Sequence, residues 1–447
     1  MKTLVWVLCC TLTTPLWAQR APKPTGNLEA RIAMLAAEYE TKLLAWRRHL
    51  HQNPELSNRE VNTAQYIVDA LAPLGLEVRT GVARTGVVAI LKGGKPGPVV
   101  ALRADMDALP VTEEVDLPFK STATAEYNGQ TVGVMHACGH DTHVAILIAT
   151  AHVLHALQAE LPGTVVFIFQ PAEESAPPDE RPAGAEQMVN EGVLRNPQVN
   201  AIFGLHVFSS VPTGVLAYRS GPLMAAVDEF TITVQGRQTH GARPWNGVDP
   251  IVVGSQIVLG LQTIASRQVD VTLEPSVITV GKFTGGVRNN IIPDSVTLWG
   301  TIRTFDPTMQ ADIHRRIART AEGIAQSAGA AARVAIVRQY PATVNHPELS
   351  AWADGVLKGL VSPSRVVTPT KQTGAEDFSF FQQQVPGFYF SLGVTPPEDL
   401  ASGQPIPLNH SPRFYVDERA LKTGVEAMST LALRFLQDNP TLSLPAR

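Results

Sequence analysis

Residues 165–174 read Val-Val-Phe-Ile-Phe-Gln-Pro-Ala-Glu-Glu. The first five are apolar without alternation, which is typical of a strand buried on both faces of a parallel sheet. Two adjacent glutamates, Glu173 and Glu174, follow where this strand is expected to end. Adjacent glutamates are usually a solvated pair, but such a pair is less expected directly after a buried strand. The stretch therefore predicts an α/β sheet that carries functional carboxylates at one edge.

Other parts of the chain repeat this pattern. Further apolar runs predict buried strands at residues 87–91, 99–102, 201–205 and 388–392. Apolar residues at helical spacing predict helices at residues 28–50, 62–74 and 142–157. Strands that alternate with helices indicate an α/β fold with a largely parallel sheet.

The pattern changes between about residues 228 and 336. Alternating apolar residues there predict strands at 230–234, 276–282 and 295–303, and helical spacing occurs at 250–267 and 309–327. Strand, helix, two strands and helix form an α+β unit of their own. We therefore expect an α+β domain, residues 228–336, inserted into a larger domain made of residues 19–227 and 337–447.

Polar residues with the chemistry of ligands follow several of the predicted strands. Asp105 and Asp107 come after the run that ends at residue 102, and His206 comes after the run that ends at residue 205. His410 follows the run at residues 388–392. Because binding sites in open α/β sheets form at the carboxyl ends of the strands, we expect these side chains to gather near Glu173.

Residues 136–141 read His-Ala-Cys-Gly-His-Asp. Cys138 in this run has three interpretations: a metal ligand, a nucleophile or a small buried hydrophobe. Gly139 would let the Cys138 thiolate and the His140 imidazole reach the same ion. We assign His136 to a supporting position rather than to a ligand. Structural or surface roles are expected for the remaining histidines at this stage, His49, His51, His143, His152, His155, His314 and His346.

The N-terminus resembles a secretory signal peptide. Lys2 precedes an apolar run at residues 4–12, and cleavage is expected after Ala18. Cys9 and Cys10 would leave with residues 1–18, so that Cys138 would be the only cysteine of the mature chain. A lipoprotein anchor at Cys9 is the alternative, but the preceding leucine fits that processing poorly. We expect an exported protein, either periplasmic or secreted.

Composition fits a compact globular enzyme. The 447 residues are 44% hydrophobic and 17% charged, which provides a large core and suggests more than one domain. The formal net charge is −4, and no basic patch indicates nucleic acid or an anionic membrane as a partner. No later apolar stretch approaches the roughly 20 residues that a membrane span needs.

Six ordered motifs resemble the aminoacylase and carboxypeptidase family of dinuclear metallohydrolases. They extend over almost the whole mature chain, at residues 47–57, 102–110, 135–141, 171–174, 236–241 and 374–378. Within this family, the run Met135-His-Ala-Cys-Gly-His140 is similar to the branch of hippurate hydrolases and auxin-conjugate hydrolases. The resemblance implies a catalytic domain with an inserted lid or dimerisation domain.

The resemblance also implies two divalent metal ions per subunit, bridged by the Cys138 thiolate. One ion would also bind His140 and His206, and the other would bind Glu174 and His410. Zinc, manganese, cobalt and nickel are the candidate ions, and a thiolate favours a borderline metal such as zinc.

Two aspartates near this set receive different roles. The resemblance implies that Asp107 supports the metal ligands without binding the ions. Asp105 occupies a position where distant relatives have a histidine ligand, and we do not count it as a ligand.

The chemistry of amide hydrolysis assigns the remaining glutamate. A metal-activated water would attack the amide carbonyl, and Glu173 would take its proton and pass it to the leaving nitrogen. From the resemblance, His240 would stabilise the tetrahedral oxyanion, Asn290 and Gly374 would hold substrate, and Arg303 would bind the substrate carboxylate. In relatives the histidine equivalent to His240 comes from a second subunit, so we expect a homodimer formed through the inserted domain.

The sequence therefore predicts an exported metallo-amidohydrolase. It would hydrolyse N-acyl or N-aroyl amino acids, such as hippurate-like compounds, to a carboxylic acid and a free amino acid. A dipeptidase or carboxypeptidase on the same scaffold is the first alternative. A hydrolase that uses Cys138 as nucleophile and a non-catalytic binding protein are the others. The preferred acyl group depends on loops that the sequence does not place.

Overall fold

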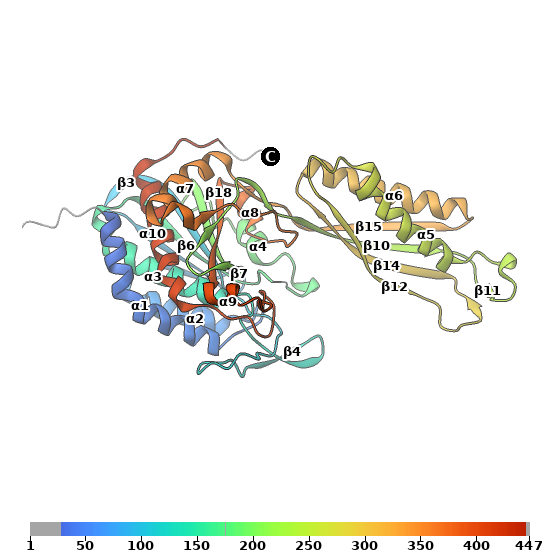
Figure 1. Ribbon diagram of the computed structural model, residues 1–447, viewed down its shortest axis with the longest axis horizontal. Helices are drawn as coiled ribbons and strands as arrows, with labels where there is room; N and C mark the ends of the chain where they lie inside the picture. Colours follow the sequence, from blue (N-terminus) through green and yellow to red (C-terminus); the bar gives the residue numbers. More distant parts are fainter. Residues whose placement is uncertain (1–27, 175, 444–447) are drawn as a thin grey trace, which may run out of the picture.

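The computed structural model describes residues 28–174 and 176–443 of the chain. A main α/β domain holds the central sheet, and a longer, narrower domain formed by residues Ala226–Tyr340 projects from it (Figure 1). The predicted signal peptide, residues 1–18, and residues 19–27 lie outside the described residues. Across the described residues, no helix is long and apolar enough to cross a membrane.

The main sheet is largely parallel, as predicted. Within the described residues its strands lie in the order β1 (Glu77–Val82), β2 (Gly86–Lys92), β6 (Pro162–Gln170), β3 (Lys95–Asp105), β7 (Ala201–Pro212), β18 (Gly387–Thr395), β8 (Leu216–Ala217) and β17 (Val366–Val367). The four strands β6, β3, β7 and β18 are parallel neighbours, whereas β2 pairs with β6 in the antiparallel direction. The five apolar runs that predicted buried strands are confirmed.

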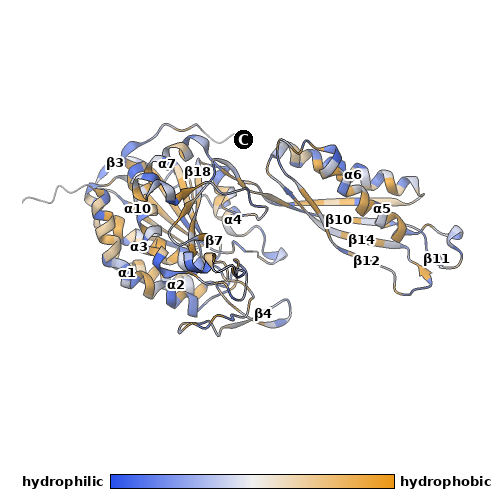
Figure 2. Ribbon diagram, in the orientation of Figure 1, coloured by the Kyte–Doolittle hydropathy of each residue, from blue (hydrophilic) through white to orange (hydrophobic). Residues whose placement is uncertain are grey.

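Helices cover both faces of this sheet, which explains the long apolar runs in its central strands. Phe167 and Phe203 point into one core, while their neighbours Val166 and Ile202 point into another. The first core is covered by α1 (Leu28–Gln52), α2 (Val61–Leu71), α3 (His140–Ala156), α7 (Pro347–Leu360) and α10 (Leu421–Asp438). The second is covered by α4 (Gly184–Asn190) and α8 (Ser379–Gln382). Figure 2 shows hydrophobic residues along the central strands and a mixture of hydrophobic and hydrophilic residues along α1.

Helix α3 holds the run that contains Cys138 against the sheet. Residues 140–154 of this helix are all buried, which is consistent with its packing between α1, α10 and the strands. A helix without an exposed stripe is fixed from every side. The start of α3 is therefore a rigid platform for side chains at the sheet edge.

The inserted domain is an α+β unit. Its antiparallel sheet has the order β12 (Val277–Gly285), β14 (Ser295–Thr304), β10 (Ala226–Gln235) and β15 (Ala331–Tyr340), and the helices α5 (Pro250–Thr263) and α6 (Pro307–Ser327) cover one face. The three predicted strands and two predicted helices are confirmed. Strand β15 was missed, because it lies at an edge of the sheet and its residues are mostly half-buried or exposed. Such a strand has a weak apolar signal.

Candidate metal centre

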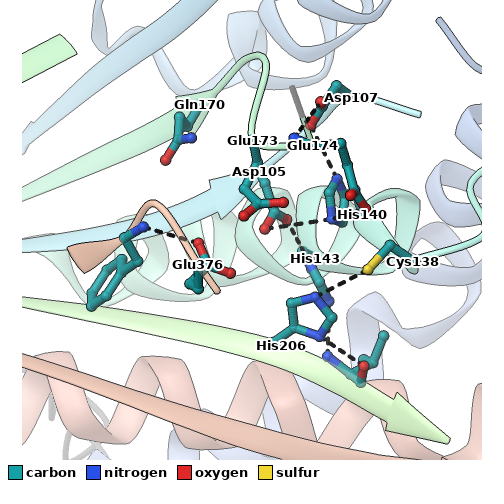
Figure 3. Close-up of polar contacts among 12 residues, drawn as sticks. Asp105, Asp107, Cys138, His140, His143, Gln170, Glu173, Glu174, His206 and Glu376 are labelled. Carbon is teal, nitrogen blue, oxygen red and sulfur yellow. Dashed lines mark hydrogen bonds and ion pairs between the residues drawn. The ribbon is translucent and has the colours of Figure 1, made fainter. Parts of the chain in front are cut away.

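The candidate site lies where three parallel strands approach their carboxyl ends. Strand β3 ends at Asp105 and β6 ends at Gln170, three residues before Glu173. Our expectation that β7 ends at residue 205 was wrong, because the strand continues to Pro212. Its last pair with β3 is Gly204 with Arg103, and His206 pairs with Ser391 of β18, so His206 lies within β7 at about the level of Asp105, the last residue of β3. Figure 3 shows the side chains of Asp105, Glu173 and His206 directed toward the same region at this end of the sheet.

The turn before α3 places Cys138 opposite His206. Gly139 has a φ of 91°, a left-handed conformation that side-chain-bearing residues rarely adopt. A Cβ at this position would lie 2.3 Å from Cγ2 of Val207. Only glycine therefore fits this turn, and α3 begins at the next residue, His140. The Cys138 Sγ lies 3.4 Å from His206 Nε2.

The structure brings all five predicted ligands together. His410 Nε2 lies 3.2 Å from Glu174 Oε1, and His140 Nε2 lies 3.8 Å from the same oxygen. Cys138, Glu174 and His410 offer ligand atoms that all lie within 4.8 Å of one another. His410 is the most exposed of the five, which opens the site toward solvent. The mixture of one sulfur, three imidazoles and one carboxylate suits borderline divalent cations.

The hydrogen bonds of the two buried histidines test whether these residues fit a metal. His140 Nδ1 donates to Asp107 Oδ1 at 3.2 Å, and His206 Nδ1 donates to the carbonyl of Val207 at 2.8 Å. Their Nε2 atoms then carry lone pairs toward the site. No described residue forms a hydrogen bond with His140 Nε2, although this atom is buried. This is the arrangement of metal-binding histidines, whose second nitrogen is held by a carboxylate or carbonyl.

Asp107 holds two of the predicted ligands at once. Besides the His140 imidazole, it accepts the backbone N–H of Glu174 at 3.0 Å and the Ser57 hydroxyl at 2.6 Å. Its carboxylate is fully buried and has partners on both oxygens. Asp107 therefore orients ligands rather than offering an open ligand position.

Asp105 and His143 lie within 4.8 Å of His140 and His206 but have other partners. His143 Nδ1 donates to Asp105 at 2.5 Å, and His143 Nε2 accepts the backbone N–H of Val207 at 2.9 Å. Asp105 is also paired with Arg103 at 2.7 Å. Because protein groups already occupy these atoms, the pair supports the site from behind.

Glu173 lies in a buried acidic environment. Its carboxylate and those of Glu376 and Asp377 are within 4.8 Å of one another. Burial, followed by the charges of Glu376, Glu174 and Asp377, raises the pKa of Glu173 well above its usual value. A raised pKa makes the carboxylate a stronger proton acceptor, which is the property that a proton shuttle needs.

Sequence reasoning gave no role to the groups that surround Glu173. Arg103 is fully buried and pairs with Glu376 at 2.9 Å and with Asp377 at 3.1 Å. One signal was present, because an arginine within an apolar strand must find buried partners. Those partners are more than 270 residues away in sequence, so the signal did not identify them.

The Cys138 thiol has the wrong environment for a nucleophile. Burial, followed by the charges of Glu174 and Glu173, raises its pKa well above the usual value. Nucleophilic cysteines instead have a lowered pKa, because the thiolate is the reactive form. A bound divalent cation would reverse this effect and stabilise the thiolate. This environment, together with the ligand atoms of Glu174 and His410 within 4.8 Å of the Cys138 sulfur, favours Cys138 as a ligand over Cys138 as a nucleophile.

Two predicted residues lie far from this cluster within one chain. His240 on β11 (Thr239–His240) is exposed, and the Gly241 N–H donates to the carbonyl of Asn290 at 2.8 Å. Both belong to the tip of the inserted domain, where Figure 1 shows β11 at the end farthest from the main domain. The structure therefore does not bring His240 or Asn290 to Cys138 of the same chain.

Three further predicted residues have different surroundings. Arg303 pairs with Val227 at the opposite end of the inserted sheet, beside the main domain. The Gly374 carbonyl accepts the N–H of Ala225 at 2.9 Å. His136 is buried without a hydrogen bond to any described residue, and burial lowers its pKa to about 4.

Comparison with known proteins relates this site to others. The model of peptidase family M20/M25/M40 matches residues 101–434. Thermostable carboxypeptidase 2 of Saccharolobus solfataricus is 42% identical over 89% of this chain and 96% of its own length. The IAA-amino acid hydrolase ILR1-like 2 of Arabidopsis thaliana is 37% identical over 98% of this chain and 94% of its own. The crystal structure of Bacillus subtilis YxeP, a dinuclear metal-binding peptidase of the M20 family, is similar to this structure with a TM-score of 0.73. The two sequences are 35% identical, and the match covers 90% of this chain and 99% of YxeP.

Proposed function

The chain belongs to peptidase family M20/M25/M40 and is a metal-dependent hydrolase of amide bonds, and from that premise we propose that it releases amino acids from N-acyl or N-aroyl conjugates. The observation that carries the proposal is the buried cluster in which Glu173 stands beside five potential ligands of two cations. The products would be a carboxylic acid and a free amino acid.

Relatives support two substrate classes. The Arabidopsis relative is named for the hydrolysis of amino acid conjugates and matches nearly the whole chain. The archaeal relative is named a carboxypeptidase, which makes removal of a C-terminal residue from a short peptide the second candidate. Both reactions cleave an amide and free an amino acid, so one set of catalytic groups serves either. The difference lies in what occupies the acyl side of the bond.

Glu173 performs the proton transfers in this proposal. Two divalent cations held by Cys138, His140, Glu174, His206 and His410 would polarise the amide carbonyl and lower the pKa of water. The Glu173 carboxylate accepts a proton from the attacking water and delivers it to the leaving nitrogen. Its raised pKa suits this task, because the proton must remain on Glu173 between the two steps. Zinc is the favoured ion on donor chemistry, with manganese, cobalt and nickel as alternatives.

A second copy of the chain would complete the site. His240 and Asn290 lie at the tip of the inserted domain, away from the metal cluster of their own chain. The same domain exposes apolar side chains of α5, notably Val252 and Leu259, and its edge strand β12 exposes Phe283. Exposed apolar residues beside an open strand edge favour association. We propose a homodimer in which each tip reaches the partner's metal centre.

The experiment is a substrate panel with metal control. Purified protein is incubated with N-acetyl, N-benzoyl and indole-3-acetyl amino acids and with dipeptides, and released amine and acid are measured. We expect equal amounts of both products, loss of activity after chelation, and recovery on metal addition. No release from any compound by metal-loaded protein would contradict the proposal. N-terminal sequencing of protein from a periplasmic or culture fraction tests export and should begin at Gln19.

A further inference from the structure

Glu60 stands at the N-cap of α2 but does not cap that helix. The N-cap position favours short side chains that accept the first backbone N–H groups of the helix. Here the Glu60 side chain makes no such bond. Glu55 does so instead, because its carboxylate accepts the N–H of Asn62 at 3.2 Å and of Thr63 at 2.8 Å. Glu60 therefore departs from a local rule, which in proteins usually marks a functional constraint.

The Glu60 carboxyl points into the main domain and is fully buried. Its Oε1 accepts the backbone N–H of Ala172 at 2.8 Å, and its Oε2 accepts the Thr85 hydroxyl at 2.6 Å. A buried carboxyl is costly unless each oxygen has a partner. Both oxygens are paired here, so the side chain has one defined orientation.

Ala172, whose N–H is bound by Glu60, has an unusual backbone conformation. Its φ is 50°, in the left-handed region that residues other than glycine rarely adopt. It directly precedes Glu173 and Glu174, so its conformation sets the direction in which both carboxylates leave the end of β6. A strained residue persists only where the surroundings hold it in place. The Glu60 hydrogen bond is one such constraint, and Ser57 of the same segment acts on Glu174 through Asp107.

We infer that Glu60 is a positioning residue, which fixes the left-handed turn at Ala172 and thereby orients the proton shuttle Glu173 and the ligand Glu174. It acts through the backbone and touches neither the substrate nor the metal ligands' donor atoms. The catalytic part of this inference rests on the proposed function. The orientation of Glu174 does not, because it can be measured by metal binding alone.

Two substitutions at Glu60 separate the effect of its hydrogen-bond acceptor from the effect of its side-chain volume. Glu60→Met keeps a similar size but removes the acceptor for the Ala172 N–H. Glu60→Gln keeps an acceptor oxygen. Burial, followed by the charge of Asp107, raises the pKa of Glu60 to about 8, so glutamine resembles the largely neutral carboxyl at pH 7. Glu55→Met is the matched control, since it removes a carboxylate with the same kind of backbone contact from the same segment.

The first readout is Co²⁺ binding by metal-free protein, followed by the absorption spectrum and by the affinity of each ion. Removing a group that orients a metal ligand typically costs 10- to 100-fold in metal affinity or activity. We expect Glu60→Met to weaken one of the two Co²⁺ ions by about 10-fold or more and to lower kcat by a similar factor, with a smaller change in KM. Glu60→Gln should stay within about threefold of the wild type in both. Glu55→Met should lower Tm and leave Co²⁺ affinity and kcat unchanged.

A double substitution tests the turn itself. Glycine adopts a positive φ without strain, so the turn in Ala172→Gly depends less on Glu60. Glu60→Met with Ala172→Gly should therefore recover part of the lost Co²⁺ affinity. If Glu60→Met does not fold, Thr85→Val provides a milder test, because it removes one of the two partners that orient the Glu60 carboxyl. It should weaken the same Co²⁺ ion by a smaller factor.

Wild-type Co²⁺ affinity and kcat in Glu60→Met, or in Thr85→Val if that variant must replace it, would overturn the inference. Glu60→Gln as damaging as Glu60→Met would overturn it too, because charge rather than the acceptor would then matter. Failure of the proposed function looks different. In that case no amide is cleaved by the wild type, while Glu60→Met still changes Co²⁺ binding.

Discussion

Replacement of Glu173 by glutamine separates proton transfer from metal binding. The amide keeps the shape of the side chain and can still accept the Asp377 N–H, which lies 3.4 Å from Glu173 Oε1. It cannot take a proton from water. General acid–base catalysis typically contributes 10²- to 10⁴-fold, so we expect kcat to fall by at least about 100-fold, which corresponds to about 2.7 kcal/mol of activation free energy.

The fold and the metals should survive this change. Glu173 stands beside Glu376 and Asp377, and its pKa is raised, so the neutral amide removes a charge that burial and the neighbouring carboxylates disfavour. The unfolding temperature of the metal-free protein should therefore not fall. Metal content should stay near that of the wild type, because the five potential ligands remain. Glu174→Gln is the comparison variant and should lose metal as well as activity.

The assay combines kcat and KM on the best substrate, elemental analysis and thermal unfolding of both variants. Glu173→Gln protein that retained two ions and more than about a tenth of the wild-type kcat would refute the role of Glu173 as proton shuttle. If Glu173→Gln emptied the site and Glu174→Gln remained loaded, the roles of the two residues would have to be exchanged.

Three other predictions follow from the geometry. Mixing inactive His240→Ala and Glu173→Gln proteins under conditions of subunit exchange should restore activity, because a mixed dimer whose sites are completed in trans has one intact site. If verified mixed dimers recovered no activity, a trans role for His240 would be ruled out. Gly139→Ala places a Cβ 2.3 Å from Val207 at a residue whose φ is 91°. The free energy of unfolding should therefore fall by about 2 kcal/mol or more, and metal affinity should drop. An unchanged denaturation midpoint would contradict this steric argument. In metal-free protein the folded state keeps the Cys138 proton that the unfolded chain loses above about pH 8.5, so stability should decline as pH rises beyond that value. Cys138→Ala should remove that part of the decline in denaturation curves, and an identical slope in both proteins would contradict it.

The fold was predictable where strands are buried on both faces. An uninterrupted apolar run such as residues 165–169 does not fit a segment exposed to solvent, and the structure places this run in the centre of the sheet. Strand β15 was not predicted because half of its residues are exposed to solvent. The end of β7 was predicted at the wrong residue, because no local sequence pattern shows that a strand continues beyond its neighbour in the sheet.

The site was predictable as a set of ligands but not as a network. Glu174 stood out because it closely follows a buried strand, and Cys138 because it lies between two histidines in residues 136–140. The resemblance to the metallohydrolase family then implied the full set of five ligands. The pairing of Arg103 with Glu376 and Asp377, and of Glu60 with Ala172, joins segments more than 100 residues apart. Periodicity and spacing describe neighbours in sequence, so contacts over such separations emerge only from the folded chain.

The central claim is that this protein hydrolyses amides with two divalent cations held by one cluster of side chains. The most direct measurement is elemental analysis of active protein, together with activity during stepwise removal and return of the metal. We expect about two divalent ions per chain, activity that falls to background as they are removed, and recovery on reconstitution. Full activity in protein shown to be free of metal would contradict the account.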